Sequence, residues 1–197
     1  MPPLDRLARS ELFPTTIWQG RATELATRFP EWIALVHELR ASSPEPAGRT
    51  NRQGWNSRDM DILGRGPFAD LQALLTWAVR VALEEVMSTP PDFKLQSWIN
   101  MHDKGGFNFP HMHEGCLISG CFYLRVPQGS GGLMFRDPRP GAANARIKGR
   151  GANAHRDIHL APSDGLFVLF PSWLEHYVEP HRGDEARIAI AFNAIEA

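Results

Sequence analysis

Three histidines and one arginine in the second half of the chain have the types and spacing of a metal site with an anion-binding group beside it. His111 and His113 are separated by one residue, and in a β-strand such residues point to the same face, where two imidazoles can share one ion. One strand cannot surround an ion, so a third ligand must come from elsewhere, and His176, which follows an apolar run, is the best candidate. Arg187 begins the next apolar segment, and its guanidinium offers two parallel donors to a carboxylate. We therefore predict a metal site in which Arg187 anchors an acidic co-substrate.

Each of these residues also has an ordinary structural interpretation. Pairs of the form His-x-His occur by chance on solvated loop edges, and a single histidine such as His176 is more often structural. Arg187 could pair with Asp184 or Glu185 at the surface. Residues 188–191 are apolar on both faces of the predicted strand, however, and a charge that enters such a strand needs a partner. The joint arrangement favours a metal site with three protein ligands, which leaves positions open for substrate as catalytic sites do.

Length and composition are those of an ordinary globular chain. The chain has 197 residues, a formal net charge of −1, 43% hydrophobic residues and 22% charged residues. This length suits one domain with a sizeable core, and the low net charge does not favour nucleic acid or an anionic membrane as partner. Cys116 and Cys121 would lie on opposite faces of a strand, which disfavours a mutual disulfide. No apolar run is long enough for a membrane span or a signal peptide, so we expect a cytoplasmic protein that acts on a small-molecule or unknown substrate.

The first half of the chain contains two segments in which apolar residues recur with helical spacing. In residues 21–42, Pro30 splits the segment or opens a second helix at its first turn. Residues 67–87 begin with a proline and carry a continuous apolar stripe. We interpret the stripe as a face that packs on a sheet, with a homodimer contact as the alternative. A short extended piece is expected over residues 11–18 and a polar loop over residues 42–59.

The second half changes to short apolar segments separated by glycine and proline turns, without helices between them. The predicted strands span residues 93–101, 117–126, 133–135, 158–160, 165–170 and 187–192. This pattern is typical of antiparallel sheets that close into a barrel or jelly roll. We predict one domain over residues 1–197, in which residues 1–92 form a helical support and residues 93–197 form the β core.

One long segment between the predicted strands cannot contribute to a core. Residues 136–157 are rich in glycine, alanine, arginine and asparagine, so they should form an exposed, mobile loop. The loop could cover the mouth of the predicted site, and its positive charges would then suit an anionic substrate. A solvated loop without such a role is the alternative. Its basic residues are Arg136, Arg139, Arg146, Lys148 and Arg150.

Several motifs follow one another in a specific order through the second half of the chain. They are Asn100, Gly106, residues 111–113, residues 119–124, residues 132–135, Gly165, residues 170–171, His176 and residues 187–193. This series resembles the iron(II)- and 2-oxoglutarate-dependent dioxygenases. More narrowly, it is similar to a small group of oxygenases that carry His-x-His, a Ser-Gly-x-Tyr-Tyr-Leu-like strand and Phe-Pro-Ser-Trp-Leu-x-His. The resemblance runs from about Trp98 to Asn193, and the N-terminal half matches only loosely.

The resemblance implies both a fold and a set of roles. The fold would be mainly β: a double-stranded β-helix, or jelly roll with a cupin-like barrel, with the N-terminal helices packed on its outside. Its mouth would hold Fe(II) through His111, His113 and His176. Arg187 falls where a basic residue binds the distal carboxylate of 2-oxoglutarate, and Tyr123 falls where a strand tyrosine shares that contact. Further pocket-facing positions for cofactor binding are Asn100, Ser119 and Asn193.

The middle ligand departs from the pattern of the superfamily. Most members use two histidines and one carboxylate, whereas position 113 is histidine here. Three neutral imidazoles leave more positive charge on the ion, which alters its redox behaviour and the preference for iron over zinc or nickel. Glu114 would point away from the site in a regular strand, but a bulge could rotate it inward, so it stays an alternative ligand. We interpret His102 and His181 as solvated or pocket-rim residues.

The resemblance implies a 2-oxoglutarate-dependent dioxygenase, an oxidoreductase that uses Fe(II), 2-oxoglutarate and O2 to hydroxylate an unknown substrate with release of succinate and CO2. One alternative is a cupin-type enzyme with three histidines and no keto acid, which the predicted roles of Arg187 and Tyr123 disfavour. Another is a non-catalytic metal-binding module of the same fold, which the missing carboxylate would support. In the enzyme, an apolar wall would exclude water from the site. Candidates for this wall are Trp98, Phe107, Phe109 and Phe170.

Overall fold

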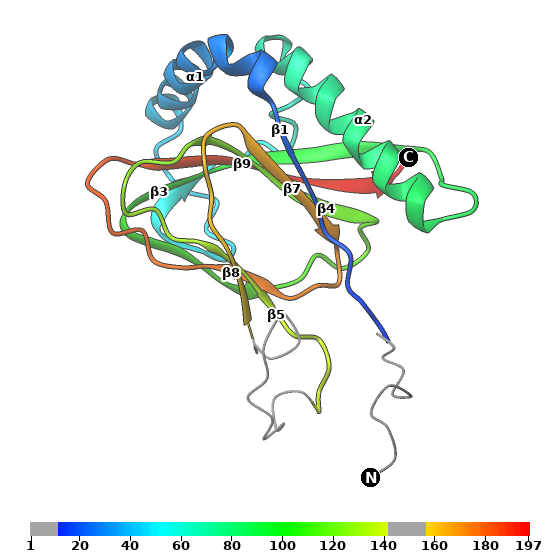
Figure 1. The fold of residues 1–197 in the computed structure, drawn as a ribbon. Helices are drawn as coiled ribbons and strands as arrows, with labels where there is room; N and C mark the ends of the chain where they lie inside the picture. Colours follow the sequence, from blue (N-terminus) through cyan, green and yellow to red (C-terminus); the bar gives the residue numbers. More distant parts are fainter. Residues whose placement is uncertain (1–11, 142–156) are drawn as a thin grey trace, which may run out of the picture.

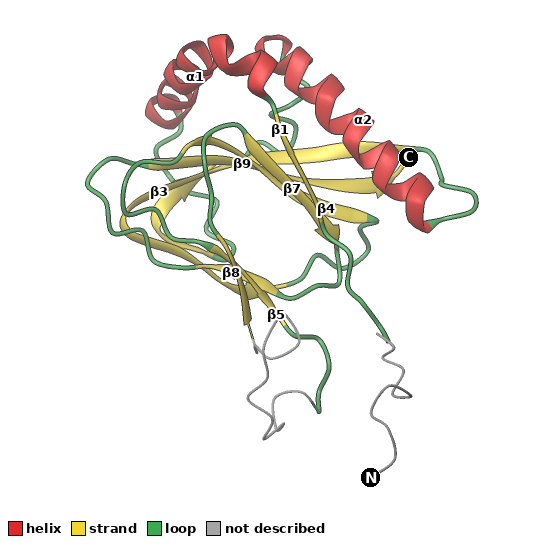
Figure 2. Ribbon diagram, viewed as in Figure 1, coloured by secondary structure: helices red, strands yellow, loops and turns green. Residues whose placement is uncertain are grey.

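The computed structural model describes residues 12–141 and 157–197, and in this part of the chain a curled antiparallel sheet carries two α-helices on its outer face (Figures 1 and 2). The strands are β1 (Trp18–Arg21), β2 (Asn51–Asn56), β3 (Phe93–His111), β4 (Ile118–Arg125), β5 (Leu133–Arg136), β6 (Asp157–Leu160), β7 (Leu166–Pro171), β8 (His176–Val178) and β9 (Arg187–Glu196). The sheet order is β1-β7-β4-β9-β3-β8-β5-β6, and β2 pairs with β3. This arrangement confirms the predicted jelly roll with helices on its outside.

The two helices cover one face of the sheet, as the apolar stripes predict. A short 3-10 turn, η2 (Thr23–Arg28), leads into α1 (Phe29–Ser42), where Pro30 occupies the first turn and loses no helical hydrogen bond. A second turn, η3 (Gly66–Phe68), leads into α2 (Ala69–Val86). Trp32 is fully buried, and its ring lies 5.6 Å from Phe68 and 6.3 Å from Phe122 of the sheet. The helical predictions for residues 21–42 and 67–87 are therefore confirmed.

Alternation along the central strands separates two apolar layers. Ile99, Ile188 and Phe122 point toward the helices and belong to the larger core. Tyr123 and Ala189 point to the opposite face, into the interior of the curled sheet. Both faces of β4 and β9 are covered, and these strands are apolar on both sides, so a polar side chain on the inner face needs a hydrogen-bond partner there.

The strand β3 is longer than the sequence pattern predicts. It pairs with β9 from Phe93 to His102 and with β8 near its end, so it runs from one side of the curled sheet to the other. Between His102 and His111 the strand contains glycines and polar residues, so its sequence does not alternate between apolar and polar residues and did not predict a strand. His111 is therefore the last residue of β3, so the two histidines do not both lie within one strand as the sequence interpretation assumed. His113 lies in the segment that follows.

Two strands were missed and one segment was misplaced. The strand β2 lies within the predicted polar loop of residues 42–59, because it is a polar strand that pairs with β3. The three-residue strand β8 is too short to show alternation. Of the extended piece expected over residues 11–18, the described residues 12–17 have no strand pairing, and β1 begins at Trp18 against β7. Both cysteines are free thiols.

Among the helices described here, none combines the length and the apolar character needed to cross a bilayer.

Candidate metal centre

The three predicted histidine ligands lie together at one end of the curled sheet. Each of His111, His113 and His176 offers one ring nitrogen, and these atoms all lie within 4.8 Å of one another. The ring centroids are 4.3 Å apart for His111 and His176, 5.0 Å for His111 and His113, and 5.2 Å for His113 and His176. In the described part of the chain, this is the group of histidine, cysteine and acidic side chains that could hold a metal ion.

Strand pairing brings these histidines together across a long sequence separation. His111 of β3 and His176 of β8 are register partners in an antiparallel pair, so their side chains lie side by side on one face. The backbone N–H of His113 donates to the carbonyl of Ser172 at 2.9 Å, which ties the segment after β3 to the turn between β7 and β8. The turn after β7 thus anchors His113 through Ser172, and β8, which follows that turn, begins with His176.

In two of the three imidazole rings, a hydrogen bond from one ring nitrogen to a backbone carbonyl leaves the other ring nitrogen available for a metal. Nδ1 of His111 lies 2.7 Å from the carbonyl oxygen of Phe109, and Nδ1 of His176 lies 2.9 Å from that of Leu174. A carbonyl only accepts, so each Nδ1 must carry the proton, and the lone pair is left on Nε2. This is the usual way in which a metal-binding histidine is oriented.

The third ring faces an amide in place of a carbonyl. In the structure, the side-chain nitrogen Nδ2 of Asn193 lies 3.4 Å from Nδ1 of His113, and Oδ1 of Asn193 accepts from the Ser119 hydroxyl at 2.8 Å. The opposite orientation of the amide has the same shape. It would turn Oδ1 toward Nδ1–H of His113, leave Nε2 of His113 free for a metal and let Nδ2 donate to Ser119. Asn193 therefore contacts the imidazole of His113, and Ser119 contacts Asn193.

Burial keeps the three imidazoles neutral. It lowers the pKa of His176 to about 3 and that of His113 to about 4, and in both cases the neighbouring histidines lower it further. The pKa of His111 is also lowered, chiefly by burial. Neutral imidazoles are the form that binds metal, so the site is ready for an ion near neutral pH without first losing protons.

The histidines open into a cavity of about 300 Å³ inside the curled sheet. Among the predicted residues, Tyr123, Asn100 and Asn193 line this cavity, as do Trp98 and Phe170 of the predicted apolar wall. Ser119 contacts Asn193 but is not part of the lining. Phe107 and Phe109 are not part of the lining either. The lining also contains residues that the sequence interpretation assigned to a loop or left without a role: Arg49, Thr50, Asn56 and Asn108.

Arg187 is buried on the inner face without an acidic partner. Its side chain is 1% exposed, Nη1 donates to Nδ1 of His102 at 2.9 Å, and the guanidinium carbon lies 5.0 Å from the centre of the Tyr123 ring. Nε of Arg187 and the hydroxyl of Tyr123 are buried without a hydrogen-bond partner. The surface pairs considered from the sequence do not form, because Asp184 pairs with Lys104 and Glu185 pairs with Arg125.

The structure corrects the expectation for His102 and His181 and shows where the alternative ligand Glu114 lies. His102 and His181 are not solvated, because they are 0% and 1% exposed and lie in the core beside Arg187. Glu114 is exposed and does not belong to the metal-binding group. Residues 142–156 of the predicted basic loop lie outside the described residues. Sequence periodicity does not reveal buried polar residues of this kind, because it separates apolar from polar side chains and does not report which polar ones are buried.

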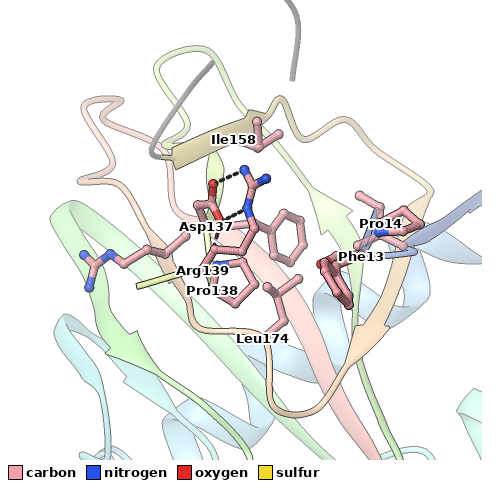
Figure 3. A pocket seen from close by; sticks show the side chains of 11 residues that line it. Phe13, Pro14, Asp137, Pro138, Arg139, Ile158 and Leu174 are labelled. Atoms are coloured by element: carbon pink, nitrogen blue, oxygen red, sulfur yellow. Dashed lines mark hydrogen bonds and ion pairs between the residues drawn. The ribbon is translucent and has the colours of Figure 1, made fainter. Parts of the chain in front are cut away.

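A second cavity, of about 240 Å³, lies between the segment around Phe13 and the segment that follows β5 (Figure 3). The Arg139 guanidinium donates to Asp137 of the same lining at 2.9 and 2.6 Å (Figure 3). The other arginine of the lining, Arg136, pairs with Glu175, which lies outside the lining. This cavity shares no lining residue with the one at the histidines. Because its charges are paired, it does not call for a charged ligand.

Similar proteins support the fold and the class of enzyme. Residues 96–193 match the model of the family described as "Putative 2OG-Fe(II) oxygenase". The solved structure of a Pseudomonas putida prolyl-4-hydroxylase is 16% identical, with a TM-score of 0.67, over 93% of this chain and 94% of that chain. HygX from Streptomyces hygroscopicus, solved with nickel and 2-oxoglutarate, is 11% identical, with a TM-score of 0.64, over 93% of this chain and 84% of that chain.

A third structure has a different activity on the same fold. The α-ketoglutarate-dependent carbocyclase SnoK from nogalamycin biosynthesis is 14% identical, with a TM-score of 0.66, over 93% of this chain and 80% of that chain. No curated protein sequence matches this one. The chain belongs to the iron(II)- and 2-oxoglutarate-dependent oxygenases, which are oxidoreductases. Within that class, its β core belongs to the family named by the matching model, and the predicted cofactors, Fe(II) and 2-oxoglutarate, are those of the family.

Proposed function

We propose that this protein is a dioxygenase that hydroxylates a small-molecule substrate, with Fe(II) held by His111, His113 and His176 and with the distal carboxylate of 2-oxoglutarate bound by Arg187 and Tyr123. When bound, iron and 2-oxoglutarate would supply oxygen activation, with release of succinate and CO2. The residues of the chain would hold both groups, orient them and exclude water. Residues 1–197 would act as one domain, since the helices and the β core share a single apolar cluster.

The observation that carries this proposal is the buried charge of Arg187. A guanidinium that is 1% exposed needs compensation, yet its hydrogen bond goes to a neutral imidazole and its Nε has no partner. The neighbouring Tyr123 hydroxyl is equally unpaired. A carboxylate placed between them would accept from both groups, which accounts for two unsatisfied donors on the inner face at once.

The histidines also suit the proposed ion. Three imidazole nitrogens that face one another, with their other nitrogens held by hydrogen bonds, form an open donor set for Fe(II), and such a set also accepts zinc, nickel or copper. Three protein ligands leave the remaining positions for the keto acid and O2. The absence of a carboxylate ligand makes the site more positive, which favours an anionic chelator.

The test is an anaerobic titration of Fe(II) and then 2-oxoglutarate into metal-free protein. The readout is the weak visible charge-transfer band of the iron–keto acid chelate. We expect the band in the wild-type protein, and we expect Arg187→Met to weaken 2-oxoglutarate binding by at least about tenfold, because a hydrogen-bonded charge pair contributes about 1.5–3 kcal/mol. Arg125→Met is the matched control, because Arg125 pairs with Glu185 outside the cavity.

The possible results separate the proposal from its alternatives. A band that depends on Arg187, followed by succinate formation on admission of O2, supports the dioxygenase. Tight metal binding without a band would instead indicate a three-histidine enzyme that does not use a keto acid. A band without any turnover would indicate a binding module. A band that survives His113→Ala would remove His113 from the ligand set.

A further inference from the structure

The cavity at the histidines contains a single permanently charged side chain, that of Arg49. Among the described residues that line the cavity, all others are apolar, neutral polar or histidine. Arg49 has no carboxylate partner in the described part of the chain, and its Nη2 contacts only the sulfur of Met60. The contrast with the second cavity is clear, since the arginines there are paired with Asp137 and Glu175.

The guanidinium of Arg49 is held close to the metal-binding group. It lies 5.4 Å from the centre of the Trp98 ring, and that ring lies 5.8 Å from the ring of His113. Trp98 is 7% exposed, so its position is fixed by packing. A cation over an aromatic face is restricted in its motion, and an anion bound by Arg49 would lie at the entrance of the same cavity.

The backbone that carries Arg49 is shaped for this placement. Arg49 has a φ of 48°, a conformation that favours glycine and costs free energy for a long side chain. The turn is closed by a hydrogen bond of 3.0 Å from Asn51 N–H to the carbonyl of Gly48, and Gly48 N–H donates to Oδ1 of Asn56 at 3.0 Å. Asn56 is 1% exposed, so a buried polar side chain fixes the turn from inside the cavity.

Neutral hydrogen-bonding groups surround the charge. Asn56 and Asn100 are register partners of β2 and β3, and both line the cavity. In the described structure, Nδ2 of Asn56 donates to no protein group. The Thr50 hydroxyl accepts from Nδ2 of Asn108 at 3.0 Å, which leaves its own hydrogen available for a ligand. Arg49, Thr50 and Asn56 therefore present donors to the same space.

We infer that these residues form a substrate subsite for an anionic oxygen group, a carboxylate or a phosphate, so that the substrate of this oxygenase is a small organic anion. The inference rests on the proposed function, in which Arg187 takes the co-substrate and leaves Arg49 for the substrate. The donors of Arg49, Thr50 and Asn56 have no carboxylate nearby, so they favour a ligand group that only accepts hydrogen bonds, such as a carboxylate or a phosphate. Arg49 is itself exposed at the edge of the cavity, and a neutral analogue of the substrate would not form a charged hydrogen bond with it.

The experiment uses probes of one shape and different charge. Fluorobenzoate, fluorophenyl phosphate and fluorobenzamide are titrated into zinc-loaded protein saturated with 2-oxoglutarate, and binding is followed by fluorine NMR. The variants are Arg49→Gln and Arg49→Gly. The second removes the side chain and suits a φ of 48°, so the fold does not depend on it. Arg58→Gln removes a charge from the same region and is the control, because Arg58 is exposed and pairs with Glu45.

We expect at least one anionic probe to bind more tightly than fluorobenzamide, and we expect both Arg49 variants to lose at least about tenfold of that affinity. The preferred anion then separates a carboxylate substrate from a phosphate substrate. Equal binding of all probes, no binding of either anion, or unchanged affinity in both Arg49 variants would overturn the inference. Loss of affinity in Arg58→Gln to the same extent would do so too.

A parallel titration separates this inference from the proposed function. In anaerobic iron-loaded protein, the Arg49 variants should form the charge-transfer band with unchanged affinity for 2-oxoglutarate. If the wild-type protein forms no band, the proposed function fails. If the band forms but the anionic probes abolish it by displacing 2-oxoglutarate, they bind at Arg187, and only the assignment of Arg49 fails.

Discussion

Replacing His102 should change how strongly acid destabilises the protein. His102 is 0% exposed, and burial, with a further contribution from the charge of Arg187, lowers its pKa from 6.5 to about 3. In the folded protein this imidazole stays neutral, whereas in the unfolded chain it takes up a proton as the pH falls through 6.5. The unfolded state then binds more protons, so His102 contributes stability above that pH that is lost progressively toward pH 3.

The size of the effect follows from the two pKa values. For one group that titrates at 6.5 when unfolded and at about 3 when folded, going from pH 7.5 to pH 5 lowers the free energy of unfolding by about 2 kcal/mol. The variant His102→Gln removes this titration, and its amide oxygen can still accept from Nη1 of Arg187. The acid-induced loss should therefore be about 2 kcal/mol smaller in the variant than in the wild type.

Urea unfolding of metal-free protein at both pH values measures this difference. His176 and His113 contribute to the acid loss of both proteins, so only the difference between them reports on His102. His37→Gln is the matched control, because it replaces one exposed histidine of α1 by the same residue type. If His102→Gln lost as much stability as the wild type between pH 7.5 and pH 5, then His102 would not be held neutral in the folded protein.

Two other substitutions test the packing and the ligand geometry. Gly120→Ala should lower the free energy of unfolding by about 1–3 kcal/mol in a thermal melt, because a Cβ would lie 2.3 Å from the Phe192 ring and 2.8 Å from the carbonyl oxygen of Val168. Gly66→Ala, where a Cβ meets nothing within 4 Å, should leave the melt nearly unchanged, and equal losses would contradict this account. Asn193→Leu should lower Co(II) affinity about 10- to 100-fold in a spectroscopic titration, because it removes the group that orients His113. Asn193→Asp should retain most of the affinity, and equal losses in both variants would mean that orientation is not the role of Asn193.

Much of the fold could be predicted because alternation and helical spacing report directly on burial. The segments around α2, β4, β7 and β9 contain enough apolar residues that each sequence predicts its element, a helix for α2 and strands for the other three. The polar strand β2 and the second part of β3 gave no such signal, since their pairing is decided by a partner strand. The interpretation of residues 42–59 as a loop failed for this reason, and with it the roles of Arg49 and Asn56 were missed.

The sequence by itself determined the residue types of the site: three histidines, an arginine at the start of an apolar strand and a tyrosine on a neighbouring strand. It could not determine which polar residues are buried, so His102 and His181 were placed at the surface although both lie in the core. Only the tertiary structure decided that Asn193 contacts His113 and that Arg187 lacks an acidic partner. The physical reason is that charge compensation and hydrogen bonding depend on which side chains meet across paired strands, whereas local periodicity depends only on neighbours along the chain.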